Sequence, residues 1–313
     1  MTKVLFLDTV HPYLQEELEK LGIQCELDNT SGYEEIKNII TQYNGIVIRS
    51  RFKLDKAILD KATDLKFIAR SGAGLENINV AYAESKGIHC FHAPEGNRDA
   101  VGEHALGMLL ALFNNLCKAD REVRNGTWIR EGNRGTELMG KTVGIIGYGN
   151  MGTAFARRLQ GFGVKVLAYD KYKQNYSDEY AAEATPEKIF EEADVLSLHI
   201  PLTEETNYLV NDKFIHKFKK NIYIINTARG KAVNTNDLVK NMRSGKVKGA
   251  CLDVLEYESI SFENIEKVRL PEAFEYLIKS EEVILSPHIA GWTFESNLKI
   301  AMVLADKIKT LIG

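Results

Sequence analysis

The chain has 313 residues, of which 44% are hydrophobic and 27% charged, and its formal net charge at pH 7 is −3. This length is enough for two domains with substantial cores, and the composition is that of an ordinary globular protein. The small net charge gives no reason to expect nucleic acid or an anionic membrane as a partner, and no apolar stretch approaches the roughly 20 residues that span a bilayer.

The N-terminal sequence and the spacing of the cysteines bear on whether the protein is secreted or stays in the reducing cytoplasm. The first ten residues, MTKVLFLDTV, predict a strand and lack the cleavage pattern of a secretory signal. The four cysteines are far apart and form no C-x-x-C pair: Cys25, Cys90, Cys117 and Cys251. Each lies in or beside apolar sequence, so we expect buried free thiols in a reducing environment. The sequence therefore predicts a cytoplasmic protein.

Strands and helices alternate through the first hundred residues. Strands are expected at 3–7, 45–48, 67–69 and 87–91, and helices at 12–21 and 54–62. This alternation predicts a parallel sheet with helices on both faces. The segment 97–124 follows, with a wide apolar stripe that indicates one helix or two closely joined ones. Asn97 or Asp99 is the expected N-cap.

Residues 141–170, KTVGIIGYGNMGTAFARRLQGFGVKVLAYD, form a complete dinucleotide-binding pattern. A β-branched apolar run leads into Gly147-Tyr148-Gly149-Asn150-Met151-Gly152, a helical segment follows, and a second apolar run ends on Asp170. The three glycines permit the tight turn, the approach of a pyrophosphate and close helix–strand packing. A carboxylate at Asp170 accepts hydrogen bonds from ribose hydroxyls and repels a 2′-phosphate. The pattern predicts NAD as the cofactor, in preference to NADP.

Polar residues follow the later predicted strands. Strands are expected at 195–200, 222–226, 250–254 and 283–285, a final helix at 294–312, and an irregular insertion at 257–280. Arg229 comes just past one strand, several acids past the next and His288 past the last. Parallel sheets bind ligands at this edge. Arginine clamps a carboxylate, and histidine takes a hydroxyl proton near neutral pH, so this set suits the oxidation of a 2-hydroxy acid.

Several sequence blocks, in order, extend this pattern into a resemblance to a known family. The blocks are ARSGAGLEN, APEGNRDAVGEHALG, the glycine fingerprint, HIPLT, NTARG, DVLEYE and SPHIAGWT. Through them the chain resembles the D-isomer-specific 2-hydroxyacid dehydrogenases, most closely the D-3-phosphoglycerate dehydrogenases. The resemblance implies two doubly wound α/β domains. A Rossmann NAD-binding domain (98–291) is inserted in a flavodoxin-like substrate domain (1–97 and 292–313).

The resemblance also assigns roles to individual residues. Arg229 is implied to bind the substrate carboxylate and carbonyl, and Glu258 to pair with the general acid/base His288. Besides the fingerprint and Asp170, the cofactor is implied to contact His199, Pro201, Thr206, Thr227, Ala228, Asp253 and Gly291. The substrate is implied to contact Arg49, Arg70, Ser71, Gly72, Ala73, Gly74 and Asn97. No metal is expected.

The implied reaction is the NAD-dependent oxidation of 3-phospho-D-glycerate to 3-phosphohydroxypyruvate, a step of serine biosynthesis. A homodimer formed through 97–128 and the absence of an appended regulatory domain are further expectations. Two alternatives remain open: a glyoxylate or hydroxypyruvate reductase on the same scaffold, and an NAD-sensing corepressor without turnover. The chain departs from the family where Glu258 is followed by Ser259 rather than proline, and where Glu76 replaces a common aspartate.

Overall fold

The computed structural model describes residues 2–258 and 271–312. The described residues form two compact units. The first unit contains residues up to 98 and from 292 onward, and the second contains 99–258 and 271–291. The chain therefore leaves the first unit, builds the second, and returns.

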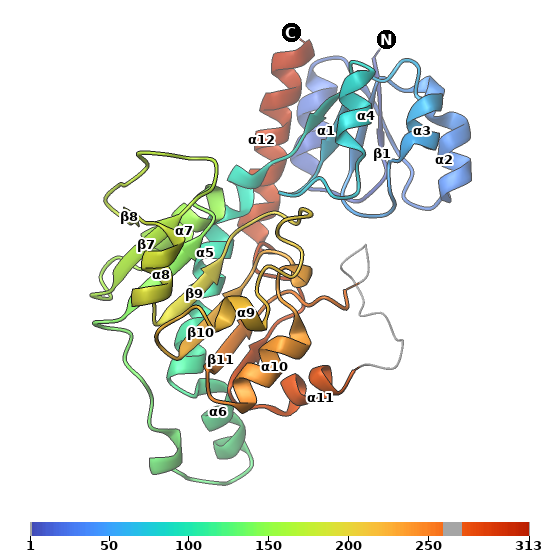
Figure 1. Cartoon of the computed structure of the whole chain (residues 1–313). Helices are drawn as coiled ribbons and strands as arrows, with labels where there is room; N and C mark the ends of the chain where they lie inside the picture. The colour runs from blue at the N-terminus through green and yellow to red at the C-terminus, as the bar shows by residue number, and fades with distance from the viewer. Residues whose placement is uncertain (1, 259–270, 313) are drawn as a thin grey trace. The chain divides into compact units, whose positions relative to one another are not determined.

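The first unit is a five-stranded parallel sheet flanked by helices (Figure 1). Its strands are β1 (Lys3–Phe6), β2 (Gln24–Leu27), β3 (Gly45–Ile48), β4 (Phe67–Arg70) and β5 (His89–Phe91). Its helices are α1 (Pro12–Lys20), α2 (Tyr33–Ile39), the 3-10 turn η1 (Ile40–Gln42), α3 (Lys56–Lys61), α4 (Val80–Ser85), the first turn of α5 (Pro94–Phe113) and α12 (Phe294–Ile312). The strand order β2-β1-β3-β4-β5 confirms the predicted flavodoxin-like topology.

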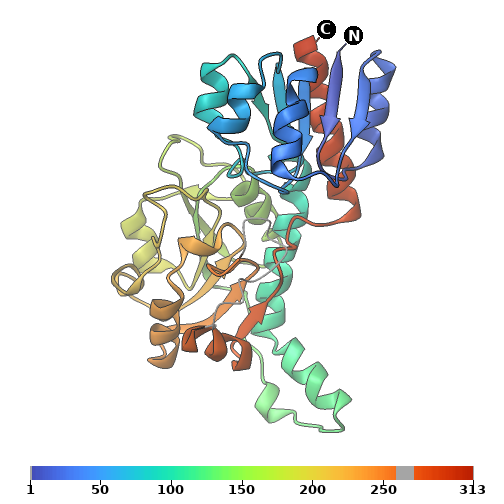
Figure 2. The same cartoon turned by 90° about the vertical axis from the view of Figure 1, so that its right-hand side faces the viewer.

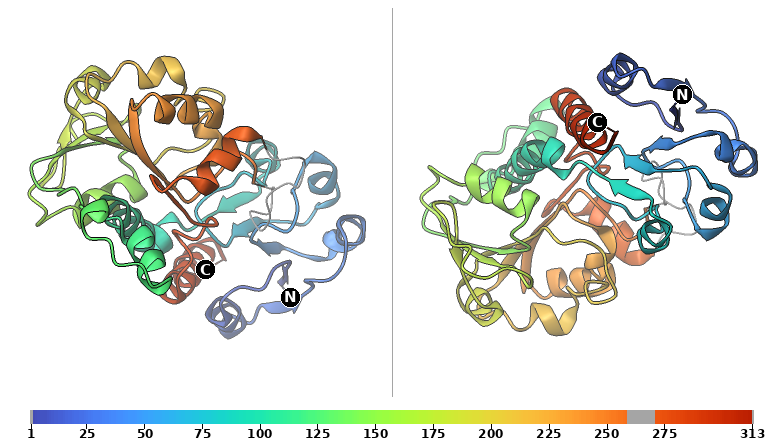
Figure 3. Two further views of the ribbon diagram at one scale, coloured as in Figure 1. Left: turned by 90° about the horizontal axis from the view of Figure 1, so that it is seen from below. Right: turned by 90° about the horizontal axis from the view of Figure 1, so that it is seen from above.

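The two faces of this sheet are covered by different parts of the chain. The helices α2, α3 and α4 bury residues such as Ile36, Ile58 and Ala83 on one face. On the other face α1 packs beside α12, which is seen nearly end-on in Figure 3. Leu14 and Leu304 are both fully buried there, because the apolar stripes of the two helices meet over the sheet. The C-terminal helix is thus part of the core of the N-terminal unit.

The second unit is a seven-stranded parallel sheet. Its strands are β6 (Thr142–Ile146), β7 (Lys165–Tyr169), β8 (Ala182–Glu183), β9 (Val195–Leu198), β10 (Ile222–Asn226), β11 (Val247–Leu252) and β12 (Val283–Leu285). Its helices are the rest of α5, α6 (Leu116–Arg124), η2 (Glu131–Asn133), α7 (Asn150–Arg158), α8 (Pro186–Glu192), α9 (Asp212–Ile215), η3 (Gly230–Ala232), α10 (Thr235–Arg243) and α11 (Glu272–Lys279). The order β12-β11-β10-β9-β6-β7-β8 reverses direction between β9 and β6, which confirms the predicted Rossmann arrangement.

This sheet also has two distinct cores. The helices α5 and α7 cover one face, where Leu109 and Phe155 are fully buried against strands including β6. Residues of α8, α9, α10 and α11 cover the opposite face, with Leu238 and Leu277 in its core. Because both faces are covered, the strands are continuous apolar runs, and β6 is buried at all of its positions.

The segment 97–124 forms two helices. Asn115 lies between α5 and α6 in the left-handed region, with φ of 53°, a conformation that asparagine tolerates better than most residues. The prediction of Asn97 or Asp99 as N-cap is wrong, because α5 already begins at Pro94. Proline is favoured in the first turn of a helix, where its missing N–H costs no hydrogen bond. Asn97 therefore lies inside α5.

Three other sequence predictions need correction. The short edge strand β2 and the helix α2 were not predicted, whereas β3, β10, β12 and α12 have the predicted bounds. The described part of the supposed irregular insertion contains a regular helix, α11, while 259–270 lie outside the described residues. The four cysteines were expected to be buried, but Cys25 and Cys90 are half-buried and only Cys251 is buried. Cys117 is exposed, because α6, which is described throughout, buries none of its residues.

Candidate active site

The glycine fingerprint lies at the point where the strand order of the second unit reverses. Gly147 follows β6 with φ of 92°, and a Cβ at this position would overlap the carbonyl oxygen of His199, which follows β9. A Cβ on Gly152 would overlap the carbonyl oxygen of Gly147. Glycine is therefore required at both positions for the turn and the helix to pack. Two backbone segments meet closely at the crevice where such sheets bind ligands.

Gly149 differs from its two neighbours in the fingerprint. A Cβ placed there meets no atom of the described residues within 4 Å. Gly149 is the N-cap of α7, so the helix begins directly after it, at Asn150. The protein's own packing does not need glycine at this position. The open side of the residue fits the approach of a pyrophosphate to the N-terminus of α7.

Asp170 directly follows β7, beside this turn. Its Oδ2 accepts a hydrogen bond from the backbone N–H of Tyr148 at 2.8 Å, and its Oδ1 accepts one from Tyr172 N–H at 3.0 Å. The Tyr148 hydroxyl in turn donates to Asp178 at 2.8 Å, and its burial and this carboxylate raise its pKa. The side chain of Tyr148 thus anchors the turn to Asp178. The two backbone N–H donors hold the carboxylate of Asp170 in place just after the strand.

Two buried polar atoms at the same sheet edge lack a partner among the described residues. They are Nδ1 of His199 and Oγ1 of Thr227. Burial lowers the pKa of His199 to about 3, so its ring is neutral at physiological pH, with Nε2 hydrogen-bonded to Ser197 Oγ at 2.8 Å. Buried polar groups without partners are uncommon and indicate an absent ligand or water. With the open face of Gly149, they fit a dinucleotide bound across the carboxyl edge of the sheet.

The turn after β10 carries Arg229. The fully buried Asn226 shapes it, because its Nδ2 donates to Arg229 O at 2.9 Å and its Oδ1 accepts from Ala228 N–H at 3.1 Å. A Cβ on Gly230 would overlap the backbone of Leu255, so this turn is packed directly against the turn after β11. Arg229 is therefore held next to the segment that leads to Glu258.

The side chains of Glu258 and His288 lie at ion-pair distance from each other. The Nδ1 of His288 lies 2.6 Å from Oε2 of Glu258, and both side chains are mostly buried, with relative exposures of 23% and 15%. The other Glu258 oxygen accepts a hydrogen bond from Leu255 N–H. His288 itself has a left-handed φ of 55°. This uncommon backbone conformation for a non-glycine residue is typical of functional positions.

Asp253 holds the loop that carries His288. Its side chain is 1% exposed, and its Oδ1 accepts from Ser286 Oγ at 2.6 Å and Ile289 N–H at 2.8 Å. Its Oδ2 accepts from Ala290 N–H at 2.9 Å, and its carbonyl accepts from His288 N–H at 2.7 Å. Asp253 was predicted to contact the cofactor, and its Oδ1 also lies 3.5 Å from Nε2 of His104 on α5. A carboxylate engaged by several donors rigidly orients the loop.

Three further side chains make hydrogen bonds to the turns and loops around these residues. Glu256 accepts from Thr235 N–H at 2.9 Å and from the Tyr208 hydroxyl at 2.6 Å, and this contact raises the pKa of Tyr208 to about 12. His104, on α5, lies 2.9 Å from Ser286 Oγ through its Nε2. The Thr206 hydroxyl, predicted to meet the cofactor, donates to Pro201 O at 2.7 Å and closes the turn after β9. Sequence reasoning missed the contact of His104, which links residues distant in the chain.

In the first unit the predicted substrate residues gather at the carboxyl ends of β3 and β4. Arg49 follows β3, and Arg70, which is 9% exposed, ends β4 with its Nε donating to Arg49 O at 3.1 Å. The backbone of the loop Ser71-Gly72-Ala73-Gly74 is fixed by several hydrogen bonds, among them one from Ser71 N–H to Ile48 O at 2.8 Å. Gly72 O accepts from Ala93 N–H at 2.8 Å, and Ala73 O lies 2.6 Å from His92 Nδ1. Asn97 adds a buried Oδ1 without a partner among the described residues.

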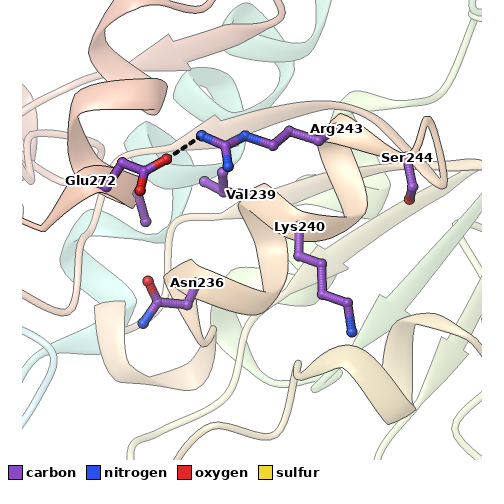
Figure 4. A pocket seen from close by; sticks show the side chains of 7 residues that line it. Asn236, Val239, Lys240, Arg243, Ser244 and Glu272 are labelled. Carbon is purple, nitrogen blue, oxygen red and sulfur yellow. Dashed lines mark hydrogen bonds and ion pairs between the residues drawn. The ribbon is translucent and has the colours of Figure 1, made fainter.

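A separate groove of about 430 Å³ lies between α10 and α11 (Figure 4). Its two basic side chains already bind acids: Arg243 pairs with Glu272 at 2.7 Å and Lys240 with Asp212 at 2.9 Å. None of the predicted site residues lines it. In the described part of the chain no cluster of His, Cys, Asp or Glu side chains could hold a metal, and no described helix is long and apolar enough to span a membrane.

Comparison with known proteins identifies the family. Residues 106–290, more than half of the chain, match the family described as "D-isomer specific 2-hydroxyacid dehydrogenase, NAD binding domain". The chain is 35% identical over 305 residues to a hydroxypyruvate reductase of Thermotoga maritima, covering 96% of each protein. It is 33% identical over 308 residues to a D-3-phosphoglycerate dehydrogenase of Archaeoglobus fulgidus, covering 98% of this chain but only 56% of that protein.

The solved structures agree with the sequence relatives. A D-lactate dehydrogenase from Aquifex aeolicus, complexed with NAD and lactic acid, superimposes with a TM-score of 0.85 at 29% identity, covering 99% of this chain and 95% of that one. The predicted NAD cofactor and dehydrogenase class are confirmed by these matches. The chain belongs to the D-isomer-specific 2-hydroxyacid dehydrogenase family and is an NAD-dependent enzyme.

Proposed function

We propose that the enzyme oxidises 3-phospho-D-glycerate to 3-phosphohydroxypyruvate with NAD, the serine-biosynthetic reaction. The observation that carries this proposal is the pair of arginines, Arg49 and Arg70, at one edge of the first unit's sheet. A small 2-hydroxy acid has one carboxylate, for which Arg229 suffices. A phosphate group needs further cations, and bidentate guanidinium groups suit it best. In this proposal residues 1–97 and 292–313 form the substrate domain and 98–291 the NAD domain.

The chemistry divides among three side chains of the second unit. Arg229 binds the substrate carboxylate and polarises the C2 oxygen. Because Nδ1 of His288 is bound to Glu258, the proposal assigns proton transfer to Nε2, which takes the proton of the C2 hydroxyl. Glu258 stabilises the resulting imidazolium. NAD, when bound, supplies the acceptor for the hydride that leaves C2, so the products are the 2-keto acid, NADH and one proton.

A substrate panel tests the proposal. Initial rates are measured for 3-phospho-D-glycerate, D-glycerate and D-lactate with NAD, and for 3-phosphohydroxypyruvate, glyoxylate and hydroxypyruvate with NADH. The proposal expects the highest kcat/KM for 3-phospho-D-glycerate in the oxidative direction. A hydroxypyruvate or glyoxylate kcat/KM that exceeds the value for 3-phosphohydroxypyruvate would contradict it.

Hydroxypyruvate reduction is the second candidate. The relative from Thermotoga maritima, named a hydroxypyruvate reductase, is matched over 96% of both chains. Both candidates use the same Arg229, Glu258 and His288 chemistry, so they differ only in the group attached to C2. The panel separates them through the effect of the phosphate on KM.

We further propose a cytoplasmic homodimer that forms through 97–128. α6 and the segment after it extend away from the seven-stranded sheet (Figure 2). Exposed large apolar side chains gather there: Leu116 at 54%, Val123 at 51% and Trp128 at 80% exposure. Such a patch indicates an association surface. Trp128→Glu is expected to convert a dimer to a monomer in sedimentation velocity, and a wild-type protein that sediments as a monomer at micromolar concentration would refute this proposal.

A further inference from the structure

One exposed aromatic side chain, Trp292, has a defined partner in the first unit. It lies just before α12 and is 60% exposed. The guanidinium carbon of Arg49, which follows β3, lies 4.8 Å from the centre of its indole ring. This distance is within the range of a cation–π contact, for which tryptophan is the best partner. The contact joins the C-terminal part of the chain to the sheet edge where the predicted substrate arginines gather.

The backbone of Arg49 is held independently of its side chain. Its N–H donates to Asp8 Oδ2 at 2.6 Å, and the same oxygen accepts from Ser50 N–H at 3.2 Å. Its carbonyl accepts from Arg70 Nε at 3.1 Å. The Cα position of Arg49 is therefore fixed by β1 and β4, whereas the indole ring constrains the direction of its long side chain.

Arg70 is fixed more tightly than Arg49. It is 9% exposed, and a Cβ on Gly72 would overlap its Nη1, so glycine at 72 makes room for the guanidinium. The strand register pairs Ile48 with Arg70, which places both arginines at the same edge of adjacent parallel strands. Two cations at one sheet edge create a local positive potential that attracts an anion.

A guanidinium that lies over an aromatic face keeps its N–H donors in its own plane. Those donors can still bind a carboxylate or phosphate bidentately. The indole ring thus restricts the rotamers of Arg49 through contact with the face of its guanidinium group. Restricting a long side chain before binding reduces the conformational entropy lost when the anion binds.

We propose that Trp292 is a positioning residue that orients Arg49 and thereby sets the preference for substrates that carry a second anionic group. This inference rests on the proposed function, in which the substrate carries a phosphate in addition to its carboxylate. Trp292 acts through Arg49, and the second group is the phosphate of 3-phospho-D-glycerate.

The test compares 3-phospho-D-glycerate with D-glycerate, which differ only in the phosphate, at saturating NAD. Trp292→Leu is expected to raise KM for 3-phospho-D-glycerate about 3- to 30-fold, the range of a cation–π contact at 25 °C, and to leave kcat and the D-glycerate KM within about two-fold. Trp292→Phe keeps an aromatic face and should recover part of the loss. Phe294→Leu is the matched control, because Phe294 is 95% exposed and lies two residues away.

Calorimetric titration of each variant with both acids, in the presence of NADH, separates the two proposals. If Trp292→Leu weakens both acids equally, or neither, the role of Trp292 in discrimination is refuted and the proposed function stands. If 3-phospho-D-glycerate binds in a Trp292-dependent manner but is not oxidised, the proposed function alone fails. If the wild-type protein binds both acids equally, both proposals fail.

Discussion

His288→Asn is expected to lower kcat about 10²- to 10⁴-fold while the Kd of NADH stays within about two-fold. The loss follows from the proposed role of His288 as the general acid/base, because removal of such a group typically costs this much. NADH binding should survive because Nδ1 of His288 is directed at Glu258, and the fingerprint is built on different strands. Steady-state kinetics with 3-phospho-D-glycerate and a fluorescence titration with NADH measure the two quantities.

Glu258→Gln provides the companion variant. Glutamine keeps a similar shape and loses the charge that stabilises an imidazolium, so kcat should fall less than in His288→Asn. The double variant should be little worse than His288→Asn alone, because the two side chains act as a unit. His216→Asn is the control, since His216 is exposed and pairs with Asp212 at the other end of the short helix α9. A His288→Asn enzyme with wild-type kcat would refute the assignment.

Gly149→Val is expected to raise the Kd of NADH more than about 100-fold while leaving the Tm of the protein without cofactor unchanged. A Cβ at Gly149 meets no described atom within 4 Å, so the side chain should fit the unliganded protein. It would occupy the space through which a pyrophosphate approaches the N-terminus of α7. Fluorescence titration with NADH and thermal unfolding without cofactor test the two halves of the prediction.

Gly152→Val is the contrasting variant within the same fingerprint. Here the added Cβ would overlap Gly147 O, so the fold itself should lose about 1–3 kcal/mol or more of stability. The two substitutions have the same chemistry and lie three residues apart, and only their surroundings differ. A Gly149→Val protein that binds NADH as tightly as wild type would contradict the placement of the pyrophosphate.

The organisation of the site explains why Asp253 and Asn226 are fully buried polar residues. Each follows or ends a central strand, and each fixes a turn that carries a reactive side chain: Asn226 the turn of Arg229, Asp253 the loop of His288. A buried polar group is stable only when its hydrogen bonds are satisfied, and these turns supply them. The same contacts that satisfy the buried groups therefore position the proposed chemistry.

Sequence reasoning succeeded where a local signal was strong. The runs in β3, β10 and β12 are continuous and mostly apolar, and α12 has an apolar stripe over 19 residues, so their bounds could be predicted. Sequence reasoning failed where the local signal was weak, or where two residues were both acceptable as the start of a helix. The edge strand β2 reads QCEL, with no fully buried position. Asn97 is a good N-cap by type, but Pro94 starts the helix one turn earlier.

By itself, the sequence determined the two doubly wound units, the dinucleotide turn and its acid, and the kinds of side chain available for the reaction. These depend on local propensity and on motifs within about thirty consecutive residues. Only the tertiary structure decided which other distant residues meet: His104 with Ser286, Gly230 with Leu255, Arg49 with Trp292. Such pairs depend on the order and register of parallel strands. That order is set by how helices pack on both faces of each sheet, which no local pattern specifies.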